Sequence, residues 1–219
     1  MSSKHLSNGR SFFRALAGPD LADLLLEVAE VATDKVAQEE FLREIPVYGI
    51  GAKALRAVRH VREELFVRKL HRFLSELKDV TPKERSMLLQ KYPDGSPEQH
   101  DLGENLLLAL DRIDSVEKPV VLARFFTAYM ADQFDYPTFS RLWRSLERFN
   151  IALLPQLRWY YTRQGTPLEV SEDLQHEFSL CGLLTVSLEQ SGLINGSADY
   201  RYSSIGKIFL DVGFGVRSE

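Results

Sequence analysis

Residues 45–77 read IPVYGIGAKALRAVRHVREELFVRKLHRFLSEL, and they pose a choice between a nucleotide-binding loop and the start of a long helix. Gly49, Gly51 and Ala54 have the spacing of a Rossmann fingerprint, which needs a strand before the glycines and an acid about twenty residues after them. Pro46 makes the preceding segment a poor strand, and the position twenty residues on is a lysine. The Gly-Lys-Ser/Thr of a Walker A loop does not occur. The glycines are therefore predicted to serve helix entry and close packing, without a cofactor, and a phosphate loop is the less favoured alternative.

The same stretch has the spacing of an amphipathic helix over about residues 51–78. Its apolar residues recur at three- and four-residue steps in two successive stripes, and we expect both to face a core. The first stripe is Leu55, Val58, Val61 and Leu65, and the second is Phe66, Leu70, Phe73 and Leu77.

Helix-start signals predict further helices on both sides of this one. Thr81 and Glu84 have the spacing of a capping box, and Asp114 and Glu117 repeat it. Ser171 can cap a later helix. With no sustained strand pattern before residue 165, the sequence predicts a mainly α fold built around a multi-helix bundle.

The C-terminal segment has a different pattern. Residues 184–203 alternate in polarity and contain the turn-prone NGSAD, which predicts a two-stranded hairpin. IGKIFLDVGFG then predicts a short helix closed by Gly213. Helix, hairpin and helix together predict a small winged-helix-like α+β unit. The predicted domains are a helical bundle over 1–165 and the tail over 166–219, divided at RQGTP (163–167).

Composition limits the class of protein. The 219 residues are 44% hydrophobic and 26% charged, with a net charge of −4, which is ordinary for a soluble globular chain. One cysteine excludes an intrachain disulfide, and no apolar run is long enough to cross a membrane. Without a signal-peptide pattern, the sequence predicts a cytoplasmic protein.

Candidate catalytic and metal-binding patterns are weak. The five histidines do not have the spacing of zinc ligands with Cys181. Cys181 lies among leucines, which predicts a buried apolar group rather than a nucleophile. No serine elbow of the G-x-S-x-G type occurs. The sequence therefore predicts no metal site and no enzyme.

Several motifs resemble a family of uncharacterised bacterial helical proteins over roughly residues 20–215. They are the Ile-Pro segment, ELFVRKLHRFLSEL, GENLLLALDRIDSVEK and the tail CGLL…YRYSSIGKIFLDV. That family resembles abortive-infection (Abi-alpha-like) proteins and ends in a winged-helix-like unit. The resemblance implies a bacterial origin and a role in phage defence, and it carries over no catalytic residue.

Two groups of side chains are candidate binding residues. The first is a basic run with a net charge of +5 between residues 53 and 72, which leaves −9 for the rest of the chain. It could bind an anionic partner, or it could be a solvated helix face paired with acids on the preceding helix, and the second interpretation is favoured. Its members are Lys53, Arg56, Arg59, Arg62, Arg68, Lys69 and Arg72.

The second group is Trp159, Tyr160 and Tyr161, which arginines flank. Such a cluster can stack on bases or line a protein interface, but the favoured interpretation is that it fills the junction between the bundle and the tail.

The sequence thus predicts a binding or regulatory protein with a protein partner. Nucleic acid and an anionic membrane surface are further possible partners, and the oligomeric state is left open. The alternative function is a nucleic-acid-binding transcriptional regulator that uses the tail. Residues 171–219 have a net charge of −4, which does not favour contact with phosphates.

Overall fold

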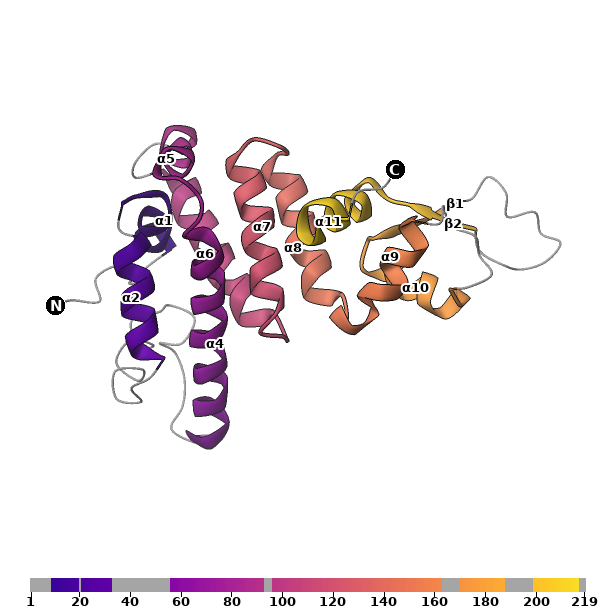
Figure 1. The fold of residues 1–219 in the computed structure, drawn as a ribbon, viewed down its shortest axis with the longest axis horizontal. Helices are drawn as coiled ribbons and strands as arrows, with labels where there is room; N and C mark the ends of the chain where they lie inside the picture. Colours follow the sequence, from indigo (N-terminus) through magenta and orange to yellow (C-terminus); the bar gives the residue numbers. More distant parts are fainter. Residues whose placement is uncertain are drawn as a thin grey trace. The chain divides into compact units, whose positions relative to one another are not determined.

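The computed structural model describes residues 9–19, 21–32, 56–92, 96–162, 170–187 and 199–216. The chain forms two compact units, Met1–Gln133 and Phe134–Glu219. Helices dominate both units, and the described β-structure is one small sheet, so the predicted mainly α fold is confirmed (Figure 1).

The first unit consists of helices packed on one another. In chain order they are α1 (Gly9–Ala17), α2 (Leu21–Val31), α4 (Arg56–Leu77), α5 (Pro82–Lys91), α6 (Pro97–Arg112) and α7 (Lys118–Met130). The main contacts join α1 to α6, α4 to α7, and α2 to α4. Aromatic rings pack between α4 and α7, where the ring centroids of Phe73 and Phe126 are 6.1 Å apart.

Two glycines let α1 and α6 approach closely. A Cβ atom added to Gly103 would collide with the backbone of Gly9, and one added to Gly9 would collide with the backbone of α6. Gly103 is the first residue of the GENLLL motif, so this part of the motif has a packing explanation.

The register of α4 agrees with one predicted stripe and contradicts part of the other. Phe66, Leu70, Phe73 and Leu77 are fully buried, as predicted. Leu65, predicted to face the core, is 40% exposed. The physical reason is that Val67 and Leu74 are also fully buried, so the buried arc of the helix widens on the side away from Leu65.

The two predicted capping boxes have different outcomes. Thr81 and Glu84 form theirs: the Glu84 amide donates to Thr81 Oγ1 and the Thr81 amide donates to Glu84 Oε2. Thr81 Oγ1 also donates to Glu84 Oε2 at 2.7 Å, and this hydrogen bond, together with the one from the Thr81 amide, lowers the pKa of Glu84.

The box predicted for Asp114 and Glu117 is wrong. Glu117 makes no side-chain cap at the start of α7, and the Asp114 carboxylate instead lies 2.6 Å from Lys118 Nζ. Lys118 is almost fully buried, so its ammonium group needs a nearby anion, and this requirement takes precedence over capping.

The second unit combines helices with the hairpin. Its elements are α8 (Tyr136–Arg148), the 3-10 turn η1 (Ile151–Leu153), α9 (Leu154–Thr162), α10 (Glu172–Leu180), β1 (Leu184–Ser187), β2 (Asp199–Tyr202) and α11 (Ser204–Phe214). The strands pair antiparallel with Leu184 opposite Tyr202, so the predicted hairpin is confirmed. Ser171 caps α10, as predicted.

The predicted domain boundary at 163–167 lies outside the described residues. The second compact unit begins at Phe134, so it contains α8 and α9 together with the tail. Phe149, just after α8, packs edge to face on Phe209 of α11 with ring centroids 5.4 Å apart. This aromatic contact joins α8 to the tail elements.

Glycines in and after α11 have distinct roles. Gly213, predicted to end this helix, lies inside it and is buried. The helix ends at Gly215, whose φ of 65° is the left-handed conformation that glycine adopts without strain. Cys181 is buried, as predicted.

Candidate binding surfaces

The predicted basic run does not form one uniform surface. Lys53 lies outside the described residues, and so do Gly49 and Gly51. Arg56, Arg59 and Arg62 belong to α4, but their side chains are also outside the described set. Of the remaining three cations, Arg68 and Arg72 are exposed, whereas Lys69 is buried.

Leu65, Arg68 and Arg72 share the outward face of α4, because steps of three and four residues return to the same side of a helix. They span about 10 Å along the helix axis. Throughout the described part of the chain, neither arginine forms an ion pair or a side-chain hydrogen bond. This trio, which we call the α4 face, therefore offers two cations beside one exposed leucine.

Lys69 has an internal role instead. Its Nζ donates to the carbonyl oxygens of Asp111 at 2.9 Å and Ile113 at 2.8 Å. These carbonyls lie at the end of α6, where the last backbone acceptors of a helix lack partners within it. Lys69 therefore joins α4 to the C-terminus of α6, and a positive charge suits that end of the helix dipole.

The predicted aromatic cluster is largely internal to the second unit. Tyr160 and Tyr161 are buried, whereas Trp159 is partly exposed. Tyr161 Oη donates to the Leu183 carbonyl at 2.5 Å, and Tyr160 Oη donates to the Tyr200 carbonyl at 2.9 Å. Both tyrosines therefore fasten α9 to the hairpin region.

A third tyrosine completes this junction. Tyr202 Oη donates back to the Tyr160 carbonyl, and its ring lies 4.6 Å from that of Tyr161. Burial raises the pKa of Tyr161 and also raises that of Tyr202. The phenols therefore act here as neutral hydrogen-bond donors.

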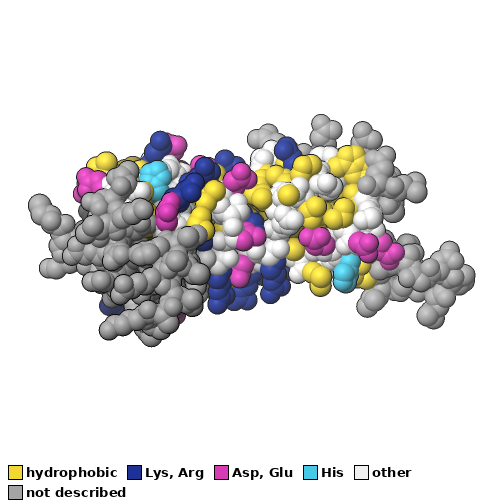
Figure 2. All heavy atoms as spheres, turned by 90° about the horizontal axis from the view of Figure 1, so that it is seen from below, with side chains coloured by type: hydrophobic (Ala, Val, Ile, Leu, Met, Phe, Trp, Pro, Cys, Tyr) yellow, Lys and Arg dark blue, Asp and Glu magenta, His cyan; other side chains and the backbone are white. Residues whose placement is uncertain are grey.

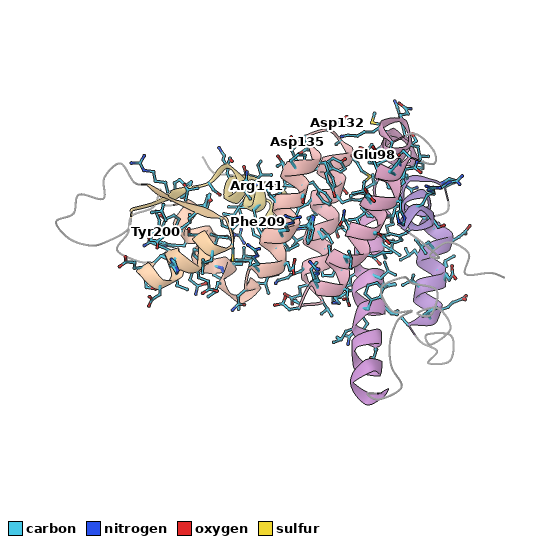
Figure 3. The ribbon with its side chains drawn as sticks, turned by 180° about the vertical axis from the view of Figure 1, so that it is seen from behind. Glu98, Asp132, Asp135, Arg141, Tyr200 and Phe209 are labelled. Carbon is cyan, nitrogen blue, oxygen red and sulfur yellow. The ribbon has the colours of Figure 1, made fainter. Side chains whose placement is uncertain are left out.

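The second unit has a basic face that the sequence analysis missed. Arg141, Arg144 and Arg148 are all exposed on α8, at steps of three and four residues. The opposite side of α8 buries Phe139, Leu142 and Leu146, among others. Figure 3 labels Arg141 on this helix, and Figure 2 shows Lys and Arg side chains gathered in groups rather than evenly spread. The arginines at steps of three and four, opposite an apolar stripe, were the signal in the sequence.

Acidic side chains of the second unit concentrate on another helix. Glu172 and Asp173 are exposed in the first turn of α10, and Glu177 follows one turn later. His176 Nδ1 on the same helix lies 3.3 Å from Tyr200 Oη. With no Lys or Arg in α10, this helix presents an acidic surface.

Arg85 is a buried cation in the first unit. Its side chain is 7% exposed, and burial lowers its pKa. Within the described structure, its Nε and Nη1 groups have no hydrogen-bond partner. Guanidinium N–H groups that have lost their water without gaining an acceptor, as at Nε and Nη1, are energetically unfavourable.

Metal-ligand clusters and membrane-spanning helices are both absent from the residues that the structure describes. Among the described residues, no group of three or more His, Cys, Asp or Glu side chains could hold a metal ion. Within the same residues, no helix is long and apolar enough to cross a membrane. No family model matches the chain, and neither a curated protein nor a solved structure matches it.

Proposed function

We propose that the chain is a non-enzymatic bacterial protein that acts by binding an acidic protein partner through the α4 face. The observation that carries this proposal is the exposed Leu65 beside Arg68 and Arg72, two arginines without ion pairs in the described part of the chain. All three side chains are exposed and none fills the core of the first unit, so a partner can contact them.

The chemistry of the α4 face suits a protein more than a simple anion. Protein interfaces combine apolar anchors with arginines, and the fully buried centre of such a patch is the part that contributes most. Leu65 offers the apolar contact, while Arg68 and Arg72 can hold carboxylates in a forked geometry. Glu64, beside Leu65 and also exposed, would restrict which acidic surfaces fit.

The setting that we propose is phage defence of the abortive-infection type. Support comes from the resemblance of the α4, α6 and C-terminal motifs to that group of bacterial proteins. A regulator that binds nucleic acid through the C-terminal tail is the weaker candidate, because the described cations of α10, β1, β2 and α11 are Arg201 and Lys207 alone, whereas α10 is acidic.

A plating assay tests the proposed setting. Bacteria that express the chain from its native locus should reduce plaque formation by a panel of phages. The double variant R68E/R72E should restore plaques at unchanged protein abundance, because charge reversal repels an acidic partner. The matched control K83E/R112E makes the same charge change at exposed positions of α5 and α6 and should preserve protection. Protection that survives R68E/R72E would contradict a role for the α4 face.

A further inference from the structure

The arginine face of α8 is the most basic surface among the described helices of the second unit, although Glu147, partly exposed, lies between Arg144 and Arg148 in the sequence. Arg141, Arg144 and Arg148 are exposed, and none of them forms an ion pair with another side chain in the described ranges. Arg144 does lie 5.5 Å from the ring centroid of its neighbour Trp143. The helix is fixed from its other side by a buried apolar stripe, so the arginines are held on a rigid element.

Their spacing suits a regular polyanion. Seven residues separate Arg141 from Arg148, which is about 10 Å along the helix axis. A nucleic-acid duplex presents one phosphate per about 3.4 Å of axis on each strand. Three long arginine side chains over this length can therefore contact up to about three phosphates of one strand when α8 lies parallel to the duplex axis.

The surroundings of the arginines argue against other anionic partners. No large hydrophobic side chain is exposed on α8. A helix that lies in a membrane surface needs such side chains to enter the lipid, and a protein interface needs them as anchors. Single-stranded nucleic acid is bound with exposed aromatic rings, and Trp143 and Phe139 of this helix are buried.

We propose that the α8 arginine face binds the phosphate backbone of a nucleic-acid duplex without sequence preference. This goes beyond the proposed function, because it concerns a different surface and a different class of partner. Backbone contacts fix position and orientation but carry no sequence information. The face would thus hold the protein on nucleic acid, while the α4 face remains available for a protein.

Fluorescence anisotropy with a labelled random-sequence DNA duplex, and with the corresponding RNA duplex, tests this. Binding should weaken about 40-fold between about 50 and 200 mM salt, since three phosphate contacts give a logarithmic slope of about −2.7. R141E/R148E should abolish binding, and R141Q/R148Q should reduce the slope to about −0.9. Binding to either duplex supports the proposal.

The control R68E/R72E makes the same charge change on α4 and should leave duplex binding unaltered. Tryptophan fluorescence, to which Trp143 on α8 contributes, checks that each variant is folded. Three results would overturn the proposal: no duplex binding by the wild-type protein, equal loss in R68E/R72E, or equal affinity for a single strand of the same length. Binding to phosphatidylserine vesicles that R141E/R148E removes, without duplex binding, would assign the face to membranes instead.

Discussion

At position 206 the close packing of α11 against Tyr161 and Leu183 requires a glycine, because there is no room for a side chain. An added Cβ would collide with Tyr161 Oη and with the Leu183 carbonyl, the two groups that hydrogen-bond each other. We expect Gly206→Ala to lower the free energy of unfolding by about 1–3 kcal/mol, as overpacked sites do. Urea unfolding followed by tryptophan fluorescence measures this, because Trp143 and Trp159 both lie in the second unit.

Gly215→Ala is the matched control for this substitution. Gly215 has a positive φ, but no atom lies within 4 Å of an added Cβ. Alanine there should cost only about 1 kcal/mol, the penalty of the left-handed conformation. A larger loss in Gly215→Ala than in Gly206→Ala would contradict the packing explanation.

Arg85 gives a prediction of opposite sign. Because Nε and Nη1 are buried without a partner in the described structure, replacing the charge with an apolar side chain of similar length removes an unfavourable desolvation. Arg85→Met should be between neutral and about 2 kcal/mol more stable than the wild type. Thermal unfolding followed by circular dichroism measures this. Arg85→Lys, which keeps the charge, should not share the gain, and marked destabilisation by Arg85→Met would show that the arginine has an acceptor.

Tyr161 predicts how stability depends on alkaline pH. Burial raises its pKa above the value of about 10 that tyrosine has in an unfolded chain. Below pH 10 both states keep the proton, so stability does not change with pH. Above about pH 10 the unfolded state loses the proton first, so stability should fall with rising pH, by at most about 1.4 kcal/mol per pH unit.

Tyr161→Phe separates this effect from the hydrogen bond. The variant should be less stable by at most about 1 kcal/mol at neutral pH, because the Leu183 carbonyl loses one donor but still accepts from Ser203 Oγ at 2.9 Å. Between pH 9 and 11 the variant should lose less stability than the wild type. Some loss of stability with rising pH should remain, because burial also raises the pKa of Tyr202. Identical alkaline losses in both proteins would contradict the burial of Tyr161.

At the scale of a single element, α4 has two leucines that test its register. Leu70 is fully buried and Leu65 is 40% exposed. Leu70→Ala should cost about 2–5 kcal/mol, the range for buried leucines. Leu65→Ala should cost less than about 1 kcal/mol, because little area and no cavity are created. Equal costs, measured by thermal unfolding, would mean that Leu65 faces the core and that the α4 face does not exist as described.

Much of the element structure could be predicted because local signals act over a few residues. The Thr81 capping box, the Ser171 cap and the alternating residues of the hairpin all appear in the structure. Local signals gave wrong predictions at two places. In one, a buried charge needed a partner, and in the other, helices distant in sequence decided which side of a helix is buried. Asp114 pairs with a lysine that the core buries, and the arc of α4 depends on its neighbouring helices.

The candidate site was harder to predict for the same reason. Charge along the sequence grouped Lys69 with Arg68 and Arg72, but helix rotation turns Lys69 inward to the end of α6. The net charge of residues 171–219 says nothing of the basic face of α8, because that helix precedes the segment. Helical position, rather than charge density, separates structural from exposed cations here.

At the scale of the whole molecule, a net charge of −4 conceals local surfaces of opposite sign. The α4 face and the α8 arginine face are cationic, and α10 is acidic. Local fields of this kind guide charged partners although the total charge is unfavourable, and their range is about 8 Å at physiological salt. The two proposed binding surfaces thus belong to helices in two different compact units.

Photo-crosslinking from position 65 tests the central claim, that the α4 face binds a protein. A benzophenone side chain at position 65 in the native host should give a discrete adduct with an acidic protein. That adduct should disappear in R68E/R72E and weaken as salt is raised, and it should persist in R141E/R148E. An adduct that R68E/R72E leaves intact, or crosslinking only to lipid or nucleic acid, would contradict the claim.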